Sequence, residues 1–584
     1  MPAELLQEFG YGQVSLASTP QRSQFEQTQA VLLALDEDSL LKPFRKRSGL
    51  FAPGPDLGGW YDEFAGYDYI HSIDHGFAPG ATFGQWISAL TRGYAATGSP
   101  EALAKVDRLF SGYRATISGR FYDHARFPAY TYDKLVLACI DAKQLCGRAD
   151  GLTVLEETTD AALPHLPARA LDRGAEMCSL PHEASGPKDE SFCWDESYTL
   201  PENLFLAFQR GAGERFRALG KRYLKDDTYF DPLSENRDVL AGKHAYSYMN
   251  ALSSAMQAYL TLGSQKHLLA ASNAFRMIRT SQSFATGGWG PDEMFQPAHE
   301  GKLGDSLDTT HASFETPCGA YAHFKLTRYL LRVTRNPEYG DSMEQVMLNT
   351  VLGAKPLQLD GRAFYYSDYN FTGRKVYYRN PWPCCSGTLP QIAADYHISI
   401  YFREAQGVVT NLYIPSTARW TQDGTAFRLN QSGAYPDDSH ILFSIEASRP
   451  TETTLSFRIP SWTRGAELRV NGKRMDTLIL PGTFAAVRRV WHSGDQVELE
   501  LPMPLYLKPV DEQHPDVVAL QAGPRVLFAI TPAAPAITRR QLLAAVPVGN
   551  SGSAWQTATS TGTLRLLPFT AIGDEFYATY LHVS

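Results

Sequence analysis

Residues 97–110, TGSPEALAKVDRLF, carry the pattern that decides the fold. A short Thr-Gly-Ser-Pro turn leads into a run in which Leu103, Val106 and Phe110 fall on one helical face. The same pattern returns in residues 262–278, LGSQKHLLAASNAFRMI, and in residues 335–352, RNPEYGDSMEQVMLNTVL. Each copy follows another helical stretch, so the repeating unit is a pair of helices. Pairs that recur up to about residue 400 predict an α/α toroid rather than a single bundle.

The hydrophobic period changes to two after residue 400. In the stretch TLSFRIP, Leu455, Phe457 and Ile459 alternate with polar neighbours, as in a half-buried strand. The stretch ELRVNGK adds another strand that ends in an Asn-Gly hairpin turn. Short strands with Gly and Pro between them indicate a β-sandwich. We therefore expect a multidomain α+β chain, with a helical toroid over residues 1–400 and one or two β-sandwich domains over residues 401–584.

The composition is that of an ordinary soluble protein. Of the 584 residues, 43% are hydrophobic and 20% are charged, and a net charge of −8 gives no reason to expect nucleic acid as a partner. No stretch approaches ~18 consecutive apolar residues, so we expect no membrane span. The first residues, MPAELLQEFGYGQ, lack the pattern of a secretory signal. Seven cysteines, an odd and sparse set, fit a reducing compartment, and we expect cytoplasmic residence.

Two adjacent cysteines, Cys384 and Cys385, lie in the stretch NPWPCCSGTLPQ. Neighbouring cysteines rarely bridge each other, because a disulfide needs a wider separation of the two α-carbons. The prolines before the pair and the glycine after it indicate a loop. Upstream, Glu315 and Cys318 are three residues apart, as at the start of a helix. One carboxylate and three sulfurs would make a tetrahedral zinc site, although buried cysteines often act only as small apolar residues.

A glycine-dense stretch, TGGWGPDEMF, contains Asp292 and Glu293. A loop with so few large side chains could carry both carboxylates into a cavity. The alternative is a solvated acidic turn.

Three of these motifs occur in one order, GGWGPDEMF, FETPCG and CCSGTLP. Together they resemble the DUF1680 proteins, the glycoside hydrolase clan typified by the β-L-arabinofuranosidases of family 127. GKHAYSYMNAL, FRIPSWTRGAELRVNGK and VVALQAGPRVLFAI extend the resemblance over roughly residues 240–530.

The resemblance implies an (α/α)6 barrel with β-sandwich domains, a Zn2+ ion and a retaining mechanism. Cys384 would be the nucleophile, Glu293 the general acid/base and His244 a substrate contact. The zinc ligands would be Glu315, Cys318, Cys384 and Cys385. Zinc would keep the thiol ionised, since a free thiol with a pKa of ~8.5 is mostly protonated at neutral pH. Glu293 would first protonate the leaving oxygen and then activate water.

The chain departs from the family pattern in two places. The family has one residue between the zinc-binding Glu and Cys, whereas Glu315 and Cys318 are separated by two. The family also brings histidines to the sugar from two segments of the helical domain. The comparable stretches here are AYTYDKLVLACID and ESYTLPENLFLAF, and neither contains a histidine. We therefore expect a changed sugar preference, and the sequence gives neither the sugar nor the linkage.

Aromatic residues supply further candidates for substrate binding. Trp60, in DLGGWYDEF, could stack on a sugar, and Tyr366, in FYYSDYN, could line the same pocket. His71 and His75 are four residues apart, a spacing compatible with a second metal site.

Two other functions remain open. A toroid hydrolase or lyase could use carboxylates only, with Asp62, Asp74 or Asp292 as the base. A non-catalytic carbohydrate-binding protein could use zinc only to stabilise a loop. In each case the partner is a glycoside or oligosaccharide, with neither nucleic acid nor membrane, and a homodimer is an open option.

Overall fold

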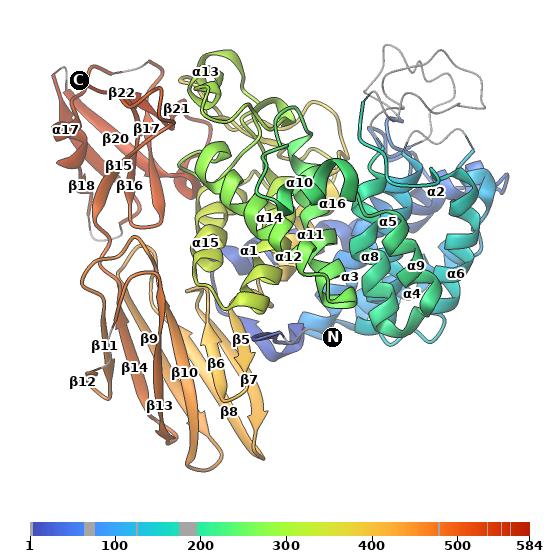
Figure 1. Ribbon diagram of the computed structural model, residues 1–584, viewed down its shortest axis with the longest axis horizontal. Coiled ribbons are helices and arrows are strands. Elements are labelled where there is room, and N and C mark those ends of the chain that lie inside the picture. Colours follow the sequence, from blue (N-terminus) through green and yellow to red (C-terminus); the bar gives the residue numbers. More distant parts are fainter. Residues whose placement is uncertain are drawn as a thin grey trace.

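The computed structural model describes residues 4–62, 76–123, 127–174, 195–476, 479–533, 535–549, 552–560 and 562–584. Helices fill the part before residue 400, and strands dominate the part after it (Figure 1). No described helix combines the length and the hydropathy that a bilayer span requires.

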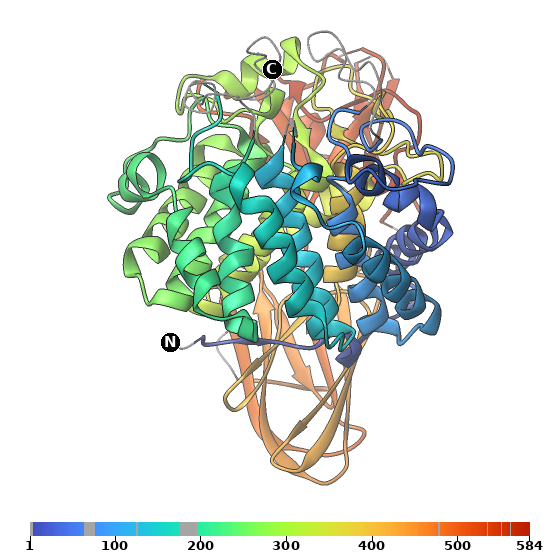
Figure 2. The ribbon, with the colours of Figure 1, turned by 90° about the vertical axis from the view of Figure 1, so that its right-hand side faces the viewer.

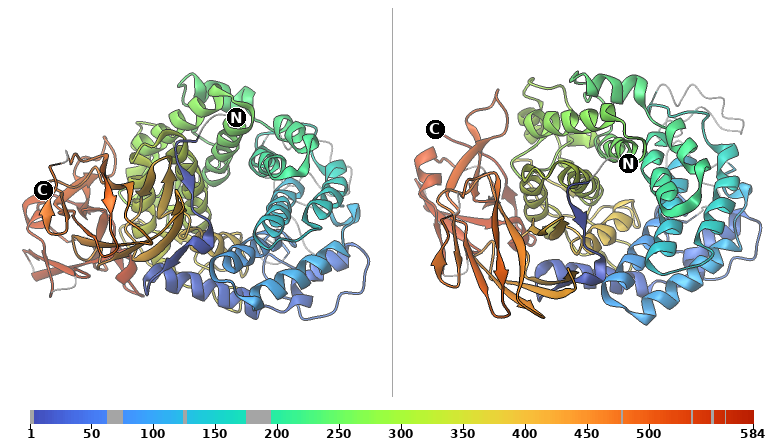
Figure 3. Two further views of the ribbon diagram at one scale, coloured as in Figure 1. Left: turned by 90° about the horizontal axis from the view of Figure 1, so that it is seen from below. Right: turned by 60° about the horizontal axis from the view of Figure 1, so that its bottom comes forward.

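Among the described residues, six helices form a closed inner ring, in which each helix packs against the next and α16 packs against α3. These helices are α3 (Phe83–Thr97), α5 (Pro128–Leu145), α8 (Leu200–Ala207), α11 (Ala245–Leu262), α14 (Thr316–Thr334) and α16 (Cys385–Asp395). Figure 3 shows the ring from its end. Inner helices are buried almost all round, and every residue from Ala245 to Leu260 is buried in α11.

A second set of helices lies outside the ring, each against one inner helix. These are α1 (Pro20–Ala34), α4 (Pro100–Arg114), α6 (Gly151–Ala162), α9 (Glu214–Arg222), α12 (Gln265–Met277) and α15 (Glu338–Asn349). The three helices expected from the turn-then-helix pattern are α4, α12 and α15 of this outer set. The predicted (α/α)6 barrel is therefore confirmed. Shorter helices α2 (Glu37–Arg47), α10 (Asp231–Ser234) and α13 (Lys302–Thr309) lie between the pairs.

The turns between inner and outer helices have a common physical basis. Gly98 ends α3 and Gly263 ends α11, both in the left-handed conformation that glycine adopts without steric cost. The amide of each glycine donates to a carbonyl in the last turn of its helix. Ser99 then accepts a hydrogen bond from the Ala102 amide and begins α4.

Two sheets form the predicted β-sandwich, which projects from one end of the barrel (Figure 2). One has the order β1 (Gln7–Glu8), β5 (Tyr401–Glu404), β6 (Gly407–Thr410), β10 (Thr451–Ile459) and β13 (Thr483–Trp491). The other has the order β12 (Lys473–Arg474), β11 (Glu467–Val470), β14 (Gln496–Glu500), β9 (His440–Ala447), β8 (Thr425–Ser432), β7 (Ser416–Gln422) and β2 (Val14–Leu16). Phe457 and Phe443 pack between the sheets, with ring centroids 4.8 Å apart. The sequence did not predict the two N-terminal strands, β1 and β2, which join sheets whose other strands all follow residue 400.

A third sheet forms the C-terminal part of the described chain and has a small core of its own. Its order is β15 (Leu505–Pro509), β16 (Val517–Ala522), β17 (Arg525–Ile530), β20 (Gly562–Pro568), β19 (Trp555–Thr559) and β18 (Val546–Pro547), with β21 (Tyr577–Ala578) on β17 and β22 (Leu581–His582) on β16. The helix α17 (Arg539–Leu543) packs beside it. Lys375, from the segment before α16, donates to the carbonyls of Phe569 and Ile572 at 2.6 and 2.9 Å.

Arg458 joins the sandwich to the barrel. It lies on β10 among buried residues of the core, and its charged side chain is also fully buried, with 0% exposed. Its guanidinium pairs with Asp341 and Glu344 of α15, the latter at 3.0 Å. A buried guanidinium and two buried carboxylates are stable only while they compensate each other.

We predict that Arg458→Ala lowers the free energy of unfolding by about 3–5 kcal/mol, because it leaves two buried carboxylates without a counter-charge. Denaturant unfolding followed by tryptophan fluorescence measures the change. The control is Arg488→Ala on β13, whose pair with Glu452 is 62% and 54% exposed and should cost less than about 1 kcal/mol. Equal losses in the two variants would contradict the prediction.

Candidate active site

The sulfur atoms come from the first turns of two inner helices. Glu315 is the N-cap of α14 and Cys318 lies in its first turn, as the spacing predicted. Cys384 is the N-cap of α16 and Cys385 is its first residue. The expectation of a loop at the cysteine pair was therefore wrong, because the chain turns into the helix at Cys384 itself.

The four side chains form one compact cluster. The Cys384 Sγ lies 3.4 Å from Glu315 Oε1, and the sulfurs of Cys318 and Cys385 are 3.5 Å apart. All four potential ligand atoms lie within 4.8 Å of one another, near the ~3.8 Å that tetrahedral Zn–S bonds impose on neighbouring sulfurs. The second carboxylate oxygen of Glu315 is buried and has no hydrogen-bond partner among the described residues. The group can thus hold a metal ion, with the longer Glu-x-x-Cys spacing accommodated at the helix start.

The electrostatics single out one sulfur. Burial opposes ionisation of the Cys384 thiol, but hydrogen bonds from the other two thiols and Tyr365 hold its pKa well below the ordinary value. Burial raises the pKa of Cys318 and of Cys385, and their hydrogen bonds to Cys384 contribute. Burial, followed by the charge of Cys384, raises the pKa of Glu315. One thiolate is therefore favoured, at Cys384.

Glu293 lies on a short 3-10 turn, Pro291–Glu293, in which Asp292 and Glu293 have positive φ of 53° and 61°. Non-glycine residues rarely adopt this conformation, and it is common at functional sites. The Tyr366 hydroxyl donates to Glu293 Oε1 at 2.5 Å, and His244 Nε2 lies 3.2 Å from Oε2. Burial opposes ionisation of Glu293, but His244 and then Tyr366 lower its pKa to about 2.

The histidine has a defined orientation. His244 is the N-cap of α11, and its Nδ1 accepts the Ser247 amide at 3.3 Å. Its Nε2 is therefore the protonated nitrogen that faces Glu293. Burial, followed by the charge of Arg173, lowers the pKa of His244 to about 4, so the ring is neutral near pH 7.

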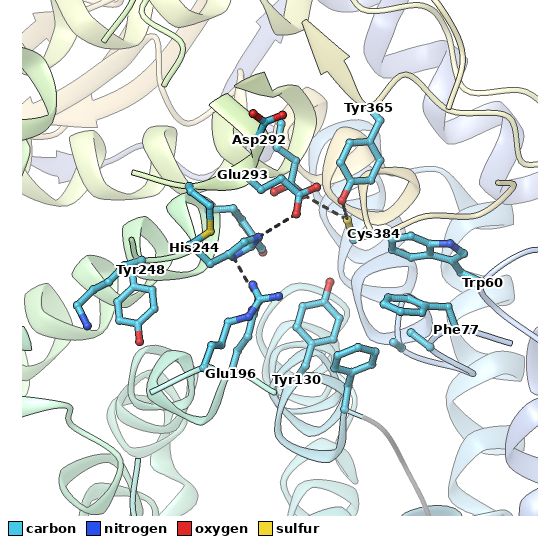
Figure 4. A pocket seen from close by; sticks show the side chains of 18 of the residues that line it. Trp60, Phe77, Tyr130, Glu196, His244, Tyr248, Asp292, Glu293, Tyr365 and Cys384 are labelled. Atoms are coloured by element: carbon cyan, nitrogen blue, oxygen red, sulfur yellow. Dashed lines mark hydrogen bonds and ion pairs between the residues drawn. The ribbon is translucent and has the colours of Figure 1, made fainter. Parts of the chain in front are cut away.

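These groups surround a cavity of about 590 Å³ at one end of the ring. The N-cap residues of five inner helices line it: Thr82, Phe127, His244, Glu315 and Cys384. At the sixth inner helix, α8, the residue that lines the cavity is Glu196, which precedes the helix. Helix N-termini carry partial positive charge, which offsets part of the cost of burying carboxylates and a thiolate around the cavity. Figure 4 shows Glu293, His244 and Cys384 around the same space.

Aromatic side chains form one wall of the cavity. Trp60 packs against Phe77 and Tyr378, with ring centroids 4.5 and 5.8 Å apart. Tyr130 and Tyr365 continue this wall beside Cys384 (Figure 4). Such faces suit the apolar C–H surfaces of a sugar ring. Trp60 lines the cavity, and its contact with a sugar stays a prediction. Tyr366 is not among the residues that line the cavity, and its hydroxyl donates to Glu293.

Several site residues escaped the sequence analysis. Tyr130 and Glu196 line the cavity and belong to the two stretches singled out for missing histidines. Two other polar residues of these stretches lie elsewhere. The Tyr132 hydroxyl contacts Thr159, and the Glu202 carboxylate accepts from Tyr329 and Lys325. Glu196 precedes a helix as a single residue, so the hydrophobic periodicity of the sequence gives no signal for it.

Asp62, Asp74 and Asp292 were considered as the base of a mechanism that uses carboxylates only. Asp292 lines the cavity and accepts from the Thr310 hydroxyl. Asp62 is buried, accepts from the Gly58 amide and is not among the residues that line the cavity. Asp74, His71 and His75 lie outside the described residues.

Family models match most of the chain. Residues 13–397 match the β-L-arabinofuranosidase GH127 catalytic domain, and residues 407–503 match the β-L-arabinofuranosidase GH127 middle domain. No curated protein sequence matches the chain.

Solved structures with the same fold span the whole chain. A GH127 β-L-arabinofuranosidase from Geobacillus stearothermophilus T6 has 17% sequence identity and a TM-score of 0.73, covering 98% of this chain and 100% of its own. A GH127 β-arabinofuranosidase has 16% identity and a TM-score of 0.75, covering 100% and 98%. These likenesses establish the fold, and the catalytic-domain model alone spans well over half of the sequence. The chain belongs to the GH127 β-L-arabinofuranosidase family of glycoside hydrolases.

Proposed function

We propose that this protein is a zinc-dependent retaining glycosidase of β-L-arabinofuranosidase type, with Cys384 as nucleophile and Glu293 as general acid/base. The observation that carries the proposal is the position of Cys384. Its sulfur belongs to the metal-binding group and also lines the cavity that contains Glu293. A purely structural cysteine would have no need to face the cavity.

Glu315, Cys318, Cys384 and Cys385 would hold the zinc ion. Three sulfurs and one carboxylate are a donor set that suits Zn2+. When bound, zinc would supply the charge that keeps these thiols deprotonated and fixed in place. The orphaned oxygen of Glu315 supports this assignment, because a buried carboxylate oxygen without a partner is costly.

The chain's own residues account for both half-reactions. In the first, the Cys384 sulfur attacks the anomeric carbon, the glycosidic C–O bond breaks, and the leaving oxygen takes a proton from Glu293. This leaves the sugar joined to Cys384 through a C–S bond. In the second, Glu293 takes a proton from water, the water oxygen attacks the anomeric carbon, and the C–S bond breaks. Two displacements retain the configuration.

The hydrogen bonds of Glu293 fit the change of role. With Tyr366 and His244 both contacting it, the carboxylate has a pKa of about 2 and is in the form of a base. Burial is the largest influence on its pKa and acts in the opposite direction. A glycosidic oxygen that displaces one of these donors therefore raises the pKa of Glu293 and favours the protonated form.

The substrate class follows from the family, and the substrate itself is a proposal. We propose a furanoside of L-arabinose or of a related sugar as the glycone. Cytoplasmic residence and a homodimer stay predictions, which cell fractionation and light scattering of the purified protein can test.

We predict that the purified protein contains about one zinc ion per chain and that Cys318→Ala removes most of it, because one of four ligands is lost. Elemental analysis of the dialysed variants measures the metal. The control is Cys139→Ala, another buried cysteine, on α5 and outside the cluster. Full zinc content in Cys318→Ala would rule out this ligand set.

We predict that Cys384→Ser lowers turnover of p-nitrophenyl β-L-arabinofuranoside by roughly 10³-fold or more, because a nucleophile is lost. Cys146→Ser, outside the site, is the control and should keep wild-type rates. Mass spectrometry after incubation with an electrophilic furanose mimic should find the label on Cys384. Substantial turnover by Cys384→Ser would favour catalysis by carboxylates alone.

We predict that Glu293→Gln loses about 10²–10⁴-fold in rate on alkyl glycosides and much less on nitrophenyl glycosides, whose leaving groups need little protonation. Initial rates across leaving groups of different pKa measure this dependence. Asp292→Asn, on the neighbouring residue, should leave the dependence unchanged. A uniform loss on all leaving groups would contradict the role of Glu293 as acid.

A further inference from the structure

Glu196 is a carboxylate residue of the cavity lining to which the proposed reaction gives no task. It lines the same space as Cys384 and His244 (Figure 4). Its carboxylate pairs with the guanidinium of Arg173. We propose that Glu196 is a specificity-determining residue that accepts a hydrogen bond from a ring hydroxyl of the bound sugar. This inference rests on the proposed glycosidase function and deepens it.

The position of Glu196 is fixed by its neighbour. The Asp195 carboxylate accepts the amides of Ala129 and Tyr130, both at 2.9 Å, at the start of α5. It also accepts the amide of Glu196 itself, at 3.0 Å. The segment before α8 is thereby fastened to the adjacent inner helix, and Glu196 extends from a rigid base. A rigid contact loses little conformational entropy when it binds a ligand.

The carboxylate of Glu196 has an unused acceptor. Its Oε1 lies 3.3 Å from Arg173 and 3.8 Å from Nδ1 of His244. That nitrogen already accepts the Ser247 amide, so it has no proton to donate to Glu196. The Oε2 atom is buried and has no hydrogen-bond partner among the described residues. An unpaired buried acceptor costs about 1–3 kcal/mol, which a donor from a ligand would recover.

A sugar hydroxyl is the donor that fits this place. Glu196 lies between His244, which contacts Glu293, and Tyr130 on the aromatic wall, so it borders the space for the sugar that reacts. The terminal torsion of a glutamate is soft, and either oxygen can turn toward the cavity. Arg173 also lines the cavity and can donate to the oxygen of an adjacent hydroxyl. The pair suits a glycone with two free neighbouring hydroxyls.

The stretches AYTYDKLVLACID and ESYTLPENLFLAF lack the histidines that contact the sugar in the family. Glu196 and Arg173 would bind the sugar hydroxyls in their place. Burial raises the pKa of Glu196 to about 7, so above that pH its carboxylate is a charged acceptor beside a charged donor. Such a pair binds hydroxyls more strongly than neutral groups do. A site built in this way rejects sugars that lack the matching hydroxyl, because the buried carboxylate is then left unpaired. The sugar class recognised here is therefore defined by a vicinal diol.

The test measures binding rather than turnover. Full-length Glu293→Gln protein, which keeps the four proposed zinc ligands, is titrated by calorimetry with methyl pentosides and hexosides and with analogues of each that lack one ring hydroxyl. We expect the loss of one particular hydroxyl to weaken binding roughly 10–100-fold. In Glu293→Gln/Glu196→Ala this difference should fall to about threefold or less, and in Glu293→Gln/Glu196→Gln, which keeps the side-chain shape, it should be intermediate. The control Glu293→Gln/Glu452→Gln changes an exposed carboxylate on β10 and should keep the full difference.

The outcomes separate this inference from the proposed function. The inference is overturned if removing the hydroxyl weakens binding as strongly in the Glu196→Ala protein as in the protein that retains Glu196. It is also overturned if no sugar binds. If sugars bind with the expected dependence on Glu196 but the wild-type protein hydrolyses no glycoside, only the proposed catalytic function is contradicted.

Discussion

The convergence of the inner helix N-termini is the constraint on which the site depends. Five N-cap residues and Glu196 lie around one cavity because six inner helices close into a ring with their starts at the same end. Each terminus brings unsatisfied amides and partial positive charge. A cluster of carboxylates and thiols in a largely apolar cavity would otherwise be too costly to bury. The ring therefore determines both the location and the charge of the site.

The other parts of the chain hold this end of the ring in shape. The strand pair β3 (Phe314–Glu315) and β4 (Tyr366–Ser367) joins the start of α14 to the tyrosines beside Glu293. Lys375, between those tyrosines and Cys384, is held by carbonyls of the C-terminal sheet. The sandwich is joined to α15 through Arg458. The sandwich and the C-terminal sheet thus support the catalytic segments, although no residue of either lines the described cavity.

The sequence predicted the elements that face water on one side. Outer helices such as α4 carry an apolar stripe, and the strand β11 alternates buried and exposed residues, so their periods are legible. The prediction of a half-buried strand at residues 455–459 was wrong, because β10 is buried there on both faces. Inner helices have no such stripe. In α11 even Ser253, Ser254 and Gln257 are buried, because neighbouring helices cover every face. The inner ring had to be inferred from the pairing with outer helices and from the family resemblance.

The sequence predicted those site residues that belong to recognisable sequence motifs. Glu293, Glu315 and the three cysteines are brought together as their motifs implied. Glu196 and Tyr130 were not identified, because their approach to the cavity depends on the Asp195 carboxylate fastening two helices together, a contact between distant segments. The cysteine pair was misjudged for a local reason: proline before a helix and glycine within it resemble a loop.

The pairing of β1 with β5 and of β2 with β7 has a consequence for the order of events during synthesis. The partner strands of β1 and β2 are complete only when the ribosome has made everything up to residue 422. The last inner helix, α16, closes the ring at an equally late stage. Assembly is therefore dominated by contacts between remote segments, which makes folding slow and leaves strand edges uncovered in the nascent chain.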